Sequence, residues 1–292
     1  MSSNRTLKKI KYMLRFLPDE MYIQIYYFIH FKRFANLRNP QTYNEKLNWL
    51  KLHDRNPLYT KLVDKFEVKE YVTPIIGREH IIPMLGIWDS FDDINFDKLP
   101  SQFVLKCTHD SEGLVIVRDK STMDKAAAKE EIEAALKQNF YYIGREWPYK
   151  NVKPRIIAEK FMEDRVDGEL RDYKFFCFNG EPRAMFIASD RASDHVKFDY
   201  FDLDFKHLDI KQKYPHADKP LRKPETFEKM VELSRALSKG FPHVRVDFYE
   251  VEGHLYFGEL TFYHFSGFMP FEPDKWDYMF GKWLELPGWI NE

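Results

Sequence analysis

The stretch RVDFYEVEGHLYFGELTF, from Arg245 to Phe262, predicts two β-strands joined near a glycine. Both expected strands are rich in aromatic and aliphatic residues, yet Arg245, Asp247 and Glu259 lie within them. Burying a charged side chain is costly unless an opposite charge or a metal ion pairs with it. The stretch therefore predicts a hairpin that carries a charged site on one of its faces.

The spacing of the two carboxylates predicts that they are neighbours. Positions 247 and 259 are equidistant from Gly253, so an odd-length loop centred on that glycine would place them opposite each other. Arg245 lies on the same face as Asp247, because side chains alternate along a strand. Two adjacent carboxylates repel unless a cation lies between them, and oxygen ligands suit Mg²⁺. We favour a magnesium site over the alternative, in which salt bridges to Arg245 and a neighbour neutralise the pair.

The overall composition excludes several classes of protein. The 292 residues suffice for one large domain or two modest ones, and the net charge of −1 gives no indication of nucleic-acid binding. No run approaches the roughly 20 apolar residues of a membrane span, and the first residues do not resemble a signal peptide. Cys107 and Cys177 lack metal-site spacing, so we expect two buried thiols in a cytoplasmic protein.

Basic residues are concentrated at the beginning of the chain. Residues 1–38 contain eight Lys or Arg against two acids, a net charge of 8 − 2 = +6 that leaves about −7 for the remainder. Their interleaving with Leu, Ile, Tyr and Phe is typical of a helix that lies on an anionic membrane. The alternative is a helical pair packed on the main domain with a solvated basic face. We slightly favour the packed helical pair. The two are compatible, so peripheral contact with the inner face of the membrane through the basic N-terminus stays a second hypothesis.

The order of expected elements predicts an α+β protein. Helical patterns are expected in the ranges 43–53, 58–72, 124–140 and 224–240, and Pro74 is expected to end the second. Asn179-Gly180 predicts a tight hairpin turn. We expect a basic, aromatic-rich helical region at 1–57 before a domain at 58–292, which divides into a small lobe at about 100–158 and a large lobe at about 159–292.

Two further stretches carry candidate chemistry. In FVLKCTHDSEGLVIV, Lys106 precedes a polar loop whose backbone N–H groups could cover phosphate oxygens. In RIIAEKFM, Glu159 and Lys160 interrupt an apolar strand where a ribose and an adenine edge could be bound. The alternatives are an ordinary hairpin with an exposed lysine and an ordinary Glu–Lys pair on a strand edge.

Taken in order, these three stretches resemble the ATP-grasp fold. Longer matches resemble the TupA-like (teichuronopeptide biosynthesis) ATP-grasp family from about Asn39 to the end of the chain. They are YNEKLNWLKLHDRNPLYTKLVDKFEVKEYV, LPSQFVLKCTHDSEG, DYKFFCFNGEP and VRVDFYEVEGHLYFGELTFY. The resemblance implies two α+β lobes that hold ATP, preceded here by a helical extension. It also implies a ligase in surface polysaccharide synthesis, which uses ATP and Mg²⁺ to join a uronic-acid carboxylate to an amino acid or amine through an acyl phosphate.

The resemblance also implies roles for particular residues. Catalytic roles fall to Arg245, which would stabilise the transferring phosphoryl group, and to Lys106. The residues implied to contact ATP are Lys65, Lys106, His109, Ser111, Gly113, Glu159 and Lys174 and, through their backbone, Lys160, Phe161 and Met162. Those implied to hold the metal are Asp247, Glu259 and Thr261, the last at a position where ATP-grasp enzymes often have Asn. His264 also stands where a small residue or proline is expected.

Substrate residues and a competing function remain open. Arg191, His195, Lys211 and Lys213 follow the central strands and either line the acceptor site or lie on a solvated surface. Asp202 and Asp204 form an Asp-x-Asp pattern, which is typical of metal-dependent glycosyltransferases and gives the second hypothesis. A third is an ATP-binding scaffold without catalysis.

Overall fold

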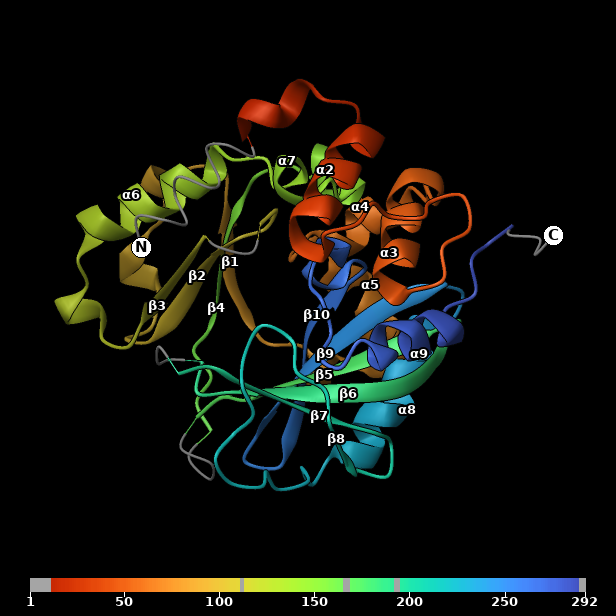
Figure 1. Ribbon diagram of the computed structural model, residues 1–292. Helices are drawn as coiled ribbons and strands as arrows, with labels where there is room; N and C mark the ends of the chain where they lie inside the picture. The colour runs from red at the N-terminus through yellow and green to blue at the C-terminus, as the bar shows by residue number, and fades with distance from the viewer. Residues whose placement is uncertain (1–11, 111–112, 165–168, 192–194, 289–292) are drawn as a thin grey trace. The chain divides into compact units, whose positions relative to one another are not determined.

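The computed structural model describes residues 12–110, 113–164, 169–191 and 195–288. Two compact units are present (Figure 1). Unit 1 consists of residues 1–56 and 164–292, and unit 2 consists of residues 57–163. The N-terminal segment that we expected as a separate region thus belongs to unit 1, and residues 57–99 belong to unit 2 with the strands that follow them.

Unit 2 is built on a four-stranded antiparallel sheet with strand order β1-β4-β2-β3. Its strands are β1 (Met84–Trp88), β2 (Phe103–Cys107), β3 (Leu114–Val117) and β4 (Ile156–Lys160). Its helices are α4 (Leu58–Val63), α5 (Glu67–Ile76), α6 (Lys125–Leu136) and α7 (Tyr141–Gly144). One sheet face packs against α6 in an apolar core that includes Phe103, Leu105 and Ile132. The opposite face carries Lys106 and Glu159.

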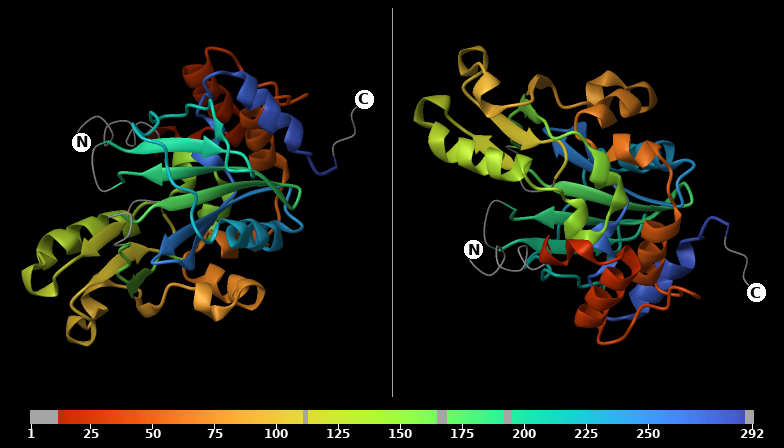
Figure 2. Two further views of the ribbon diagram at one scale, coloured as in Figure 1. Left: turned by 90° about the horizontal axis from the view of Figure 1, so that it is seen from below. Right: turned by 90° about the horizontal axis from the view of Figure 1, so that it is seen from above.

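Unit 1 is built on a six-stranded antiparallel sheet with strand order β10-β9-β5-β6-β7-β8 (Figure 2). Its strands are β5 (Asp172–Phe178), β6 (Glu181–Ser189), β7 (Lys197–Phe201), β8 (His207–Leu208), β9 (His243–Val251) and β10 (His254–Thr261). Its helices are α2 (Asp19–Phe31), α3 (Tyr43–His53), α8 (Phe227–Ser238) and α9 (Lys275–Trp283). Helix α8 packs on β5, β6 and β9, and α3 packs on α9.

The expected hairpin turn at Asn179-Gly180 is confirmed. Both residues have positive φ, at 50° and 85°, which is the backbone of a type I′ turn between β5 and β6. The buried thiols are confirmed as well: Cys107 and Cys177 are fully buried and free, and burial raises their pKa to about 12.

The single helix expected over 58–72 is instead two helices. Helix α4 ends at Val63, and the Asp64 carboxylate accepts hydrogen bonds from the backbone N–H groups of Phe66 and Glu67 at 2.7 and 3.2 Å. A carboxylate in this place satisfies the free N–H groups at the start of a new helix, so α5 begins there. Pro74 does not stop α5, which continues to Ile76. The helix expected to reach residue 140 ends at Leu136.

The pairing of Asp247 with Glu259 is confirmed, but the reason that we gave for it is wrong. The β9–β10 turn is a two-residue turn at Glu252 and Gly253, both with positive φ, and it pairs Val251 with His254. That register alone would not bring residue 247 opposite residue 259. A β-bulge between Phe257 and Glu259 shifts the register by one residue. The bulge therefore places the two carboxylates side by side.

Candidate functional site

Arg245 is the centre of a polar cluster on β9 and β10 of unit 1. Its Nε and one terminal nitrogen, Nη2, each donate a 2.7 Å hydrogen bond to the Asp247 carboxylate. Nη2 also reaches Glu259 Oε1 at 3.1 Å and the Thr261 hydroxyl at 2.9 Å. Burial opposes the charged guanidinium, but Asp247 and Glu259 outweigh it and keep the pKa of Arg245 above its usual value. The positive charge that the two carboxylates require is thus supplied in part by Arg245.

Lys174, on the neighbouring strand β5, completes this cluster. Lys174 lies opposite Asp247 in the β5–β9 pairing, and its ammonium contacts the Asp247 carboxylate directly. The same ammonium lies 3.0 Å from the carboxylate of Asp172. Asp172 is also paired with Arg191. Burial opposes ionisation of Asp172, yet Lys174 and Arg191 outweigh it and lower its pKa to about 2. Unit 1 therefore presents an alternating series of cations and carboxylates along three strands.

His264 holds Arg245 from the other side. Its Nδ1 lies 2.8 Å from Arg245 Nη1, and because arginine only donates hydrogen bonds, Nδ1 must be the unprotonated nitrogen. The protonated Nε2 then donates to Gln212 Oε1 at 2.8 Å. Burial and the nearby Arg245 charge keep the pKa of His264 well below its usual value. His264 is therefore a neutral ring that fixes the orientation of the guanidinium.

The backbone around His264 has an unusual conformation that helix α3 supports. Phe265, Ser266 and Gly267 all have positive φ, between 47° and 66°. Lys51 donates to the Ser266 carbonyl at 2.9 Å, and Asn48 donates to the Gly267 carbonyl at 2.7 Å. A strained backbone of this kind persists only where its surroundings hold it. The α3 stretch YNEKLNWLK thus contributes to the site by securing the turn that begins with His264.

A second set of charged residues lies on one face of the unit 2 sheet. Glu159 on β4 is 5% exposed and accepts from Lys106 of β2 at 2.6 Å and from Lys69 of α5 at 2.5 Å. Burial opposes its ionisation, but the two lysines outweigh it and lower the pKa of Glu159 to about 2. Glu159 therefore holds two ammonium groups in place. Lys69 was missed by the sequence analysis, although it repeats the four-residue spacing of Lys61 and Lys65 in an expected helix.

The loop after β2 is organised by its own polar groups. Lys65 contacts the backbone carbonyl of Asp110, whose carboxylate accepts from the Gly113 N–H at 3.1 Å. A Cβ at Gly113 would lie 2.5 Å from Cys107 Sγ, so only glycine fits there. The His109 ring is buried against α6, where Nε2 lies 3.2 Å from the Ala135 carbonyl, so the ring does not face solvent. Ser111 lies outside the described residues.

Lys160, which ends β4, and Phe161, which follows it, have partners within unit 2. The backbone N–H of Lys160 donates to the Pro83 carbonyl at 2.9 Å, and the Lys160 side chain is exposed. Arg118 lies over the ring of Phe161, 5.0 Å from its centroid, and Met162 is half-buried.

Comparison with known proteins places the chain in a family. The model of the TupA-like ATP-grasp family matches residues 45–285. The chain belongs to this family. No sequence match to a curated protein was found.

Solved structures share the ATP-grasp fold with this TupA-like protein. An L-amino acid ligase from Bacillus licheniformis is 14% identical with a TM-score of 0.50, and the match covers 95% of this chain and 65% of that one. A D-alanine–D-alanine ligase from Bacillus anthracis in complex with ATP is 18% identical (TM-score 0.39; 68% and 54% covered), and one from Helicobacter pylori is 16% identical (TM-score 0.43; 83% and 69% covered). The chain spans about half the length of the Bacillus anthracis enzyme.

The residues expected at the acceptor lie in loops of unit 1, between β6 and β7 and after β8. The Arg191 guanidinium forms an ion pair with Asp172. The side chains of His195, Lys211 and Lys213 are exposed. The ammonium of Lys213 lies 4.8 Å from the Tyr214 ring centroid. Asp202 is a turn residue, because its Oδ1 accepts from the backbone N–H groups of Asp204 and Lys206 at 3.0 and 2.8 Å. The Asp-x-Asp pattern thus has a structural role between β7 and β8.

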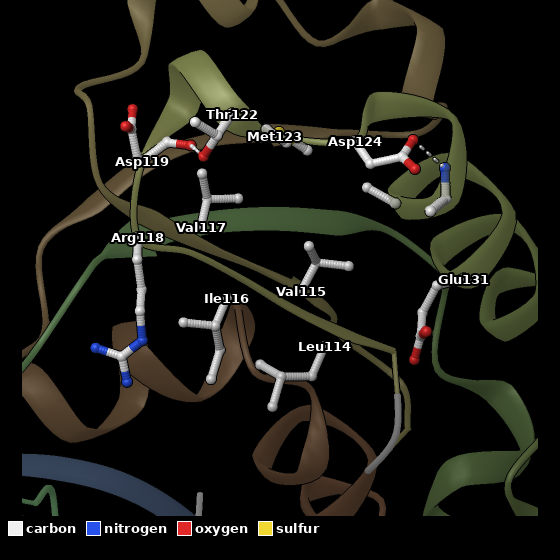
Figure 3. Close-up of a pocket in the computed structure, with 12 residues that line it drawn as sticks. Leu114, Val115, Ile116, Val117, Arg118, Asp119, Thr122, Met123, Asp124 and Glu131 are labelled. Carbon is white, nitrogen blue, oxygen red and sulfur yellow. Dashed lines mark hydrogen bonds between the residues drawn. The ribbon is translucent and has the colours of Figure 1, made fainter. Parts of the chain in front are cut away.

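A depression of about 540 Å³ lies along β3 and α6 (Figure 3). It is lined by residues 114–119 and by parts of the segment 122–131, including Asp124 and Glu131. Neither of the lysines that surround Glu159 is among the lining residues, so the depression is not where we assign the ATP phosphates.

Proposed function

We propose that this TupA-like protein is an ATP-dependent carboxylate–amine ligase of surface polysaccharide biosynthesis. It joins the carboxylate of a uronic acid to an amino acid or amine through an acyl phosphate. The proposal rests on one observation in a chain that belongs to an ATP-grasp family: hydrogen bonds to Asp247 and Glu259 hold the guanidinium of Arg245 between them.

The cluster around Arg245 suits phosphoryl transfer. Catalysis of this reaction depends mainly on positioned positive charge, because negative charge spreads over the transferring oxygens. Arg245 is held by five hydrogen bonds to Asp247, Glu259, Thr261 and His264, so it does not need to reorganise as the reaction proceeds. We assign Arg245 and Lys174 to the stabilisation of that charge.

The face of the unit 2 sheet that carries Glu159 suits a nucleotide. Lys106 pairs with Leu114, and Val104 pairs with Ile116, so these four side chains share one face. Leu114 and Ile116 are 43% and 52% exposed. Apolar side chains of this kind can pack on an adenine ring, and the ammonium of Lys106 can bind phosphate. We assign Lys65, Lys69 and Lys106 to the ATP phosphates.

Magnesium fits the exposed end of the unit 1 cluster. The Glu259 side chain is 43% exposed, whereas Asp247 is 1% exposed and in contact with both Arg245 and Lys174. Mg²⁺ commonly uses one or two protein carboxylates together with water and phosphate oxygens. We assign Glu259 as the principal ligand, with Asp247 as the second carboxylate. The Thr261 hydroxyl accepts from Arg245 and lies 3.3 Å from Glu259, beside this position. The ion would neutralise charge on the ATP phosphates.

The proposed reaction has two steps. A carboxylate oxygen of the uronic acid attacks the γ-phosphorus of ATP, the bond to the bridging oxygen breaks, and ADP leaves with that electron pair. The amine nitrogen then attacks the acyl carbon, phosphate leaves, and the nitrogen loses a proton, so that an amide forms. The family resemblance supports the uronic acid, and the exposed cations Arg191, Lys211 and Lys213 are suited to an anionic sugar.

The test is mass spectrometry of reactions that contain ATP, Mg²⁺, candidate uronic acids as free and nucleotide-linked sugars, and each amino acid. We expect ADP, phosphate and a product whose mass is the sum of the two substrates less one water. Added hydroxylamine should divert the acyl phosphate to a hydroxamate. Absence of both ADP formation and an ATP-dependent rise in melting temperature would overturn the proposal. Glycosyl transfer without ADP formation would favour the glycosyltransferase.

We also propose that α2 places the protein on an anionic membrane surface. One face of α2 packs in unit 1 through Tyr22, Ile23, Tyr26 and Tyr27, which are buried. The residues at spacings of three and four on another face are exposed, and they are Met21 (52%), Ile25 (38%), Phe28 (45%) and Ile29 (51%). None of the described helices is long and apolar enough to cross a membrane.

Basic residues accompany this apolar face. Phe16 is 81% exposed and follows the exposed Arg15, and Phe34 is 65% exposed and lies two residues after the exposed Lys32. An apolar face flanked by basic residues binds at the boundary of anionic lipid headgroups and acyl chains. The protein should sediment with vesicles that contain phosphatidylglycerol and not with neutral vesicles. The double variant Phe16→Glu, Phe28→Glu should lose this binding, and retained binding would contradict the proposal.

A further inference from the structure

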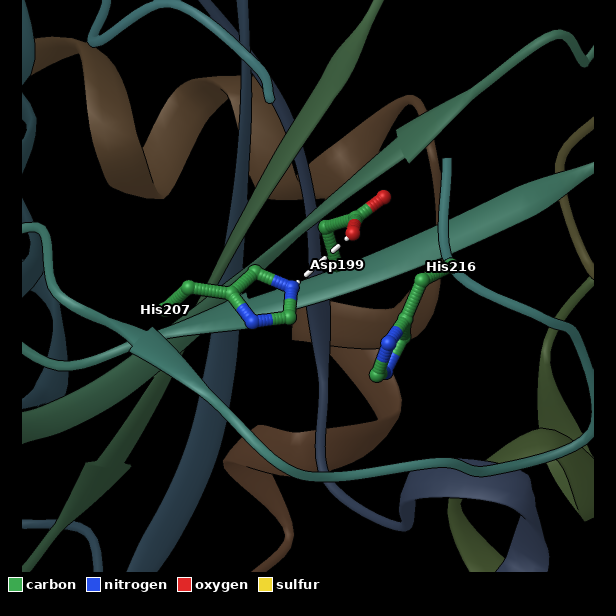
Figure 4. A group of neighbouring side chains, drawn as sticks. All are labelled: Asp199, His207 and His216. Atoms are coloured by element: carbon green, nitrogen blue, oxygen red, sulfur yellow. Dashed lines mark hydrogen bonds and ion pairs between the residues drawn. The ribbon is translucent and has the colours of Figure 1, made fainter. Parts of the chain in front are cut away.

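Strands β7 and β8 and the loop that follows bring Asp199, His207 and His216 together (Figure 4). One ligand atom from each residue lies within 4.8 Å of the others. The three residues belong to unit 1 and are none of those assigned above to ATP, magnesium or the acceptor. Two imidazoles and one carboxylate form a set of donors that binds divalent transition metals.

The strand pairing and the loop after β8 explain why Asp199, His207 and His216 lie close together. Asp199 and Phe201 share a face of β7 because side chains alternate along a strand. His207 of β8 pairs with Phe201, so it projects on the same face, diagonally opposite Asp199. The chain then returns after β8, and the backbone N–H of Phe198 donates to the Pro215 carbonyl at 2.9 Å. This bond brings the neighbouring His216 back to β7.

The hydrogen bonds around the cluster orient its metal-binding atoms. His216 Nε2 lies 2.7 Å from the Ile210 carbonyl, which can only accept, so this nitrogen carries the proton and Nδ1 has a free electron pair in the neutral ring. Asp199 Oδ2 accepts from the backbone N–H of Ala217 at 2.9 Å, while Oδ1 faces His207 Nε2 at 3.0 Å. Bonds of this kind, from the outer side of a ligand to the backbone, are typical of metal sites.

We propose that Asp199, His207 and His216 bind one divalent transition metal ion, with Zn²⁺ as the best match. The ion takes the place of the proton between His207 Nε2 and Asp199 Oδ1, and His216 Nδ1 supplies the third ligand. Three protein ligands leave the fourth tetrahedral position to water. The His207 side chain is 44% exposed, which gives the ion access from solvent. Ligand atoms of tetrahedral zinc are about 3.4 Å apart, which is compatible with the 4.8 Å limit that the three ligand atoms share here.

The site has a structural consequence for unit 1. His216 bonds to the carbonyl of Ile210, and two residues further on is Gln212, which accepts from His264. Lys211, between them, exchanges backbone hydrogen bonds with Glu272 at 2.8 and 2.9 Å. A metal ion on His216 therefore fastens the segment that supports the neutral ring of His264. None of its three ligands is assigned to ATP, magnesium or the acceptor, so we assign the ion a structural role.

The experiment measures metal binding by the full chain, without ATP. Protein stripped with a chelator is dialysed against micromolar Zn²⁺, and bound metal is determined by elemental analysis. We expect one equivalent of zinc and a rise in melting temperature. Co²⁺ in place of Zn²⁺ should give visible d–d absorption bands whose intensity indicates four or five nitrogen and oxygen ligands. Absence of stoichiometric binding by the unaltered protein would overturn the proposal.

Variants locate the ion. His207→Ala and His216→Ala should each lose stoichiometric zinc, the cobalt bands and the rise in melting temperature. The His207 side chain is 44% exposed, so His207→Ala should still fold, although Asp199 loses a hydrogen bond and the metal-free melting temperature falls slightly. This variant decides the question if His216→Ala fails to fold. His254→Ala, which removes an exposed histidine of β10 outside the cluster, and Glu259→Gln should both keep the zinc. Zinc retained by His207→Ala, or lost by Glu259→Gln alone, would place the ion elsewhere and refute the assignment.

Discussion

Nδ1 of His264 lies 2.8 Å from Nη1 of Arg245, and both side chains are buried in unit 1. The ring is neutral and accepts this hydrogen bond, and its other nitrogen donates to Gln212. Because this ring is uncharged, it orients the guanidinium without adding a third negative charge to Asp247 and Glu259, which already pair with it. His264 is therefore a positioning residue for Arg245.

Replacing His264 with Ala should reduce kcat by about tenfold to a hundredfold, because the buried N–H of Arg245 loses its acceptor at a cost of about 1–3 kcal/mol. The KM for ATP should change much less. His264→Asn should restore part of kcat, since its amide oxygen can accept from Arg245. The measurement is ADP formation in the ligation assay between pH 6 and 8. An unchanged kcat in His264→Ala would contradict the positioning role.

Replacing Glu259 with Gln should remove magnesium-dependent ATP binding, because the half-exposed carboxylate is the principal proposed ligand. Thermal melting with and without ATP and Mg²⁺ measures the effect, and we expect the ATP-dependent rise to disappear. Asp202→Asn is the control and should retain activity, because an Asn oxygen can still accept from the Asp204 and Lys206 N–H groups. Loss of activity in Asp202→Asn with full activity in Glu259→Gln would favour a glycosyltransferase.

Replacing Lys106 with Met should weaken ATP binding by about tenfold or more, because the variant removes a positioned ammonium from the proposed phosphate site. Lys69→Met should act in the same direction, since Glu159 would lose its other cation. Lys160→Met is the matched control: it removes an exposed lysine one residue away from Glu159. Isothermal titration of ATP with Mg²⁺ gives the affinities. Equal losses in all three variants would refute a specific role for Lys106.

Replacing Asp277 with Asn should stabilise the protein at pH 7. Burial raises the pKa of Asp277 from 3.8 to about 6. The hydrogen bonds from Asn44 act in the opposite direction and lower it, whereas the negative charge of Glu45 adds to the rise. The folded state therefore binds a proton that the unfolded state has lost, so the free energy of unfolding falls as the pH rises from about 4 to about 6. The wild type loses up to about 3 kcal/mol in this window.

The amide oxygen that Asp277→Asn introduces can still accept from Asn44, so this variant should avoid the loss without leaving a cavity. Urea unfolding at pH 4, 5, 6 and 7 should show a stability difference that grows with pH. A variant that is less stable than the wild type at pH 7 would show that the folded state prefers the carboxylate.

Much of the site was predictable because strand periodicity is local. The alternation of side chains is enough to place Arg245 and Asp247 on one face, and the order of the stretches around Lys106, Glu159 and Asp247 indicated the ATP-grasp fold. The register was predicted correctly for a wrong reason. The turn at Gly253 is one residue shorter than expected, and the bulge near Gly258 compensates. A bulge has no distinct sequence pattern beyond a glycine, so its position depends on the pairing of whole strands.

The partners of the charged residues were not predictable from spacing. Lys69 reaches Glu159 from a helix about 90 positions earlier, and Gln212 reaches His264 across 52 positions. His109 looked like a loop residue that faces a ligand, yet its ring packs against α6. Such contacts depend on the packing of elements that are distant in sequence, for which neither periodicity nor composition carries information.

The sequence alone determined the family, the α+β class and the identity of the charged residues, because these follow from local periodicity and from ordered motifs. The tertiary structure decided how those charges are compensated. It showed that Arg245 lies between Asp247 and Glu259, that two lysines surround Glu159, and that three residues of β7, β8 and the next loop converge. The physical reason is that a charge is stabilised by whichever partner the fold brings within a few ångströms, and that partner is set by packing rather than by spacing along the chain.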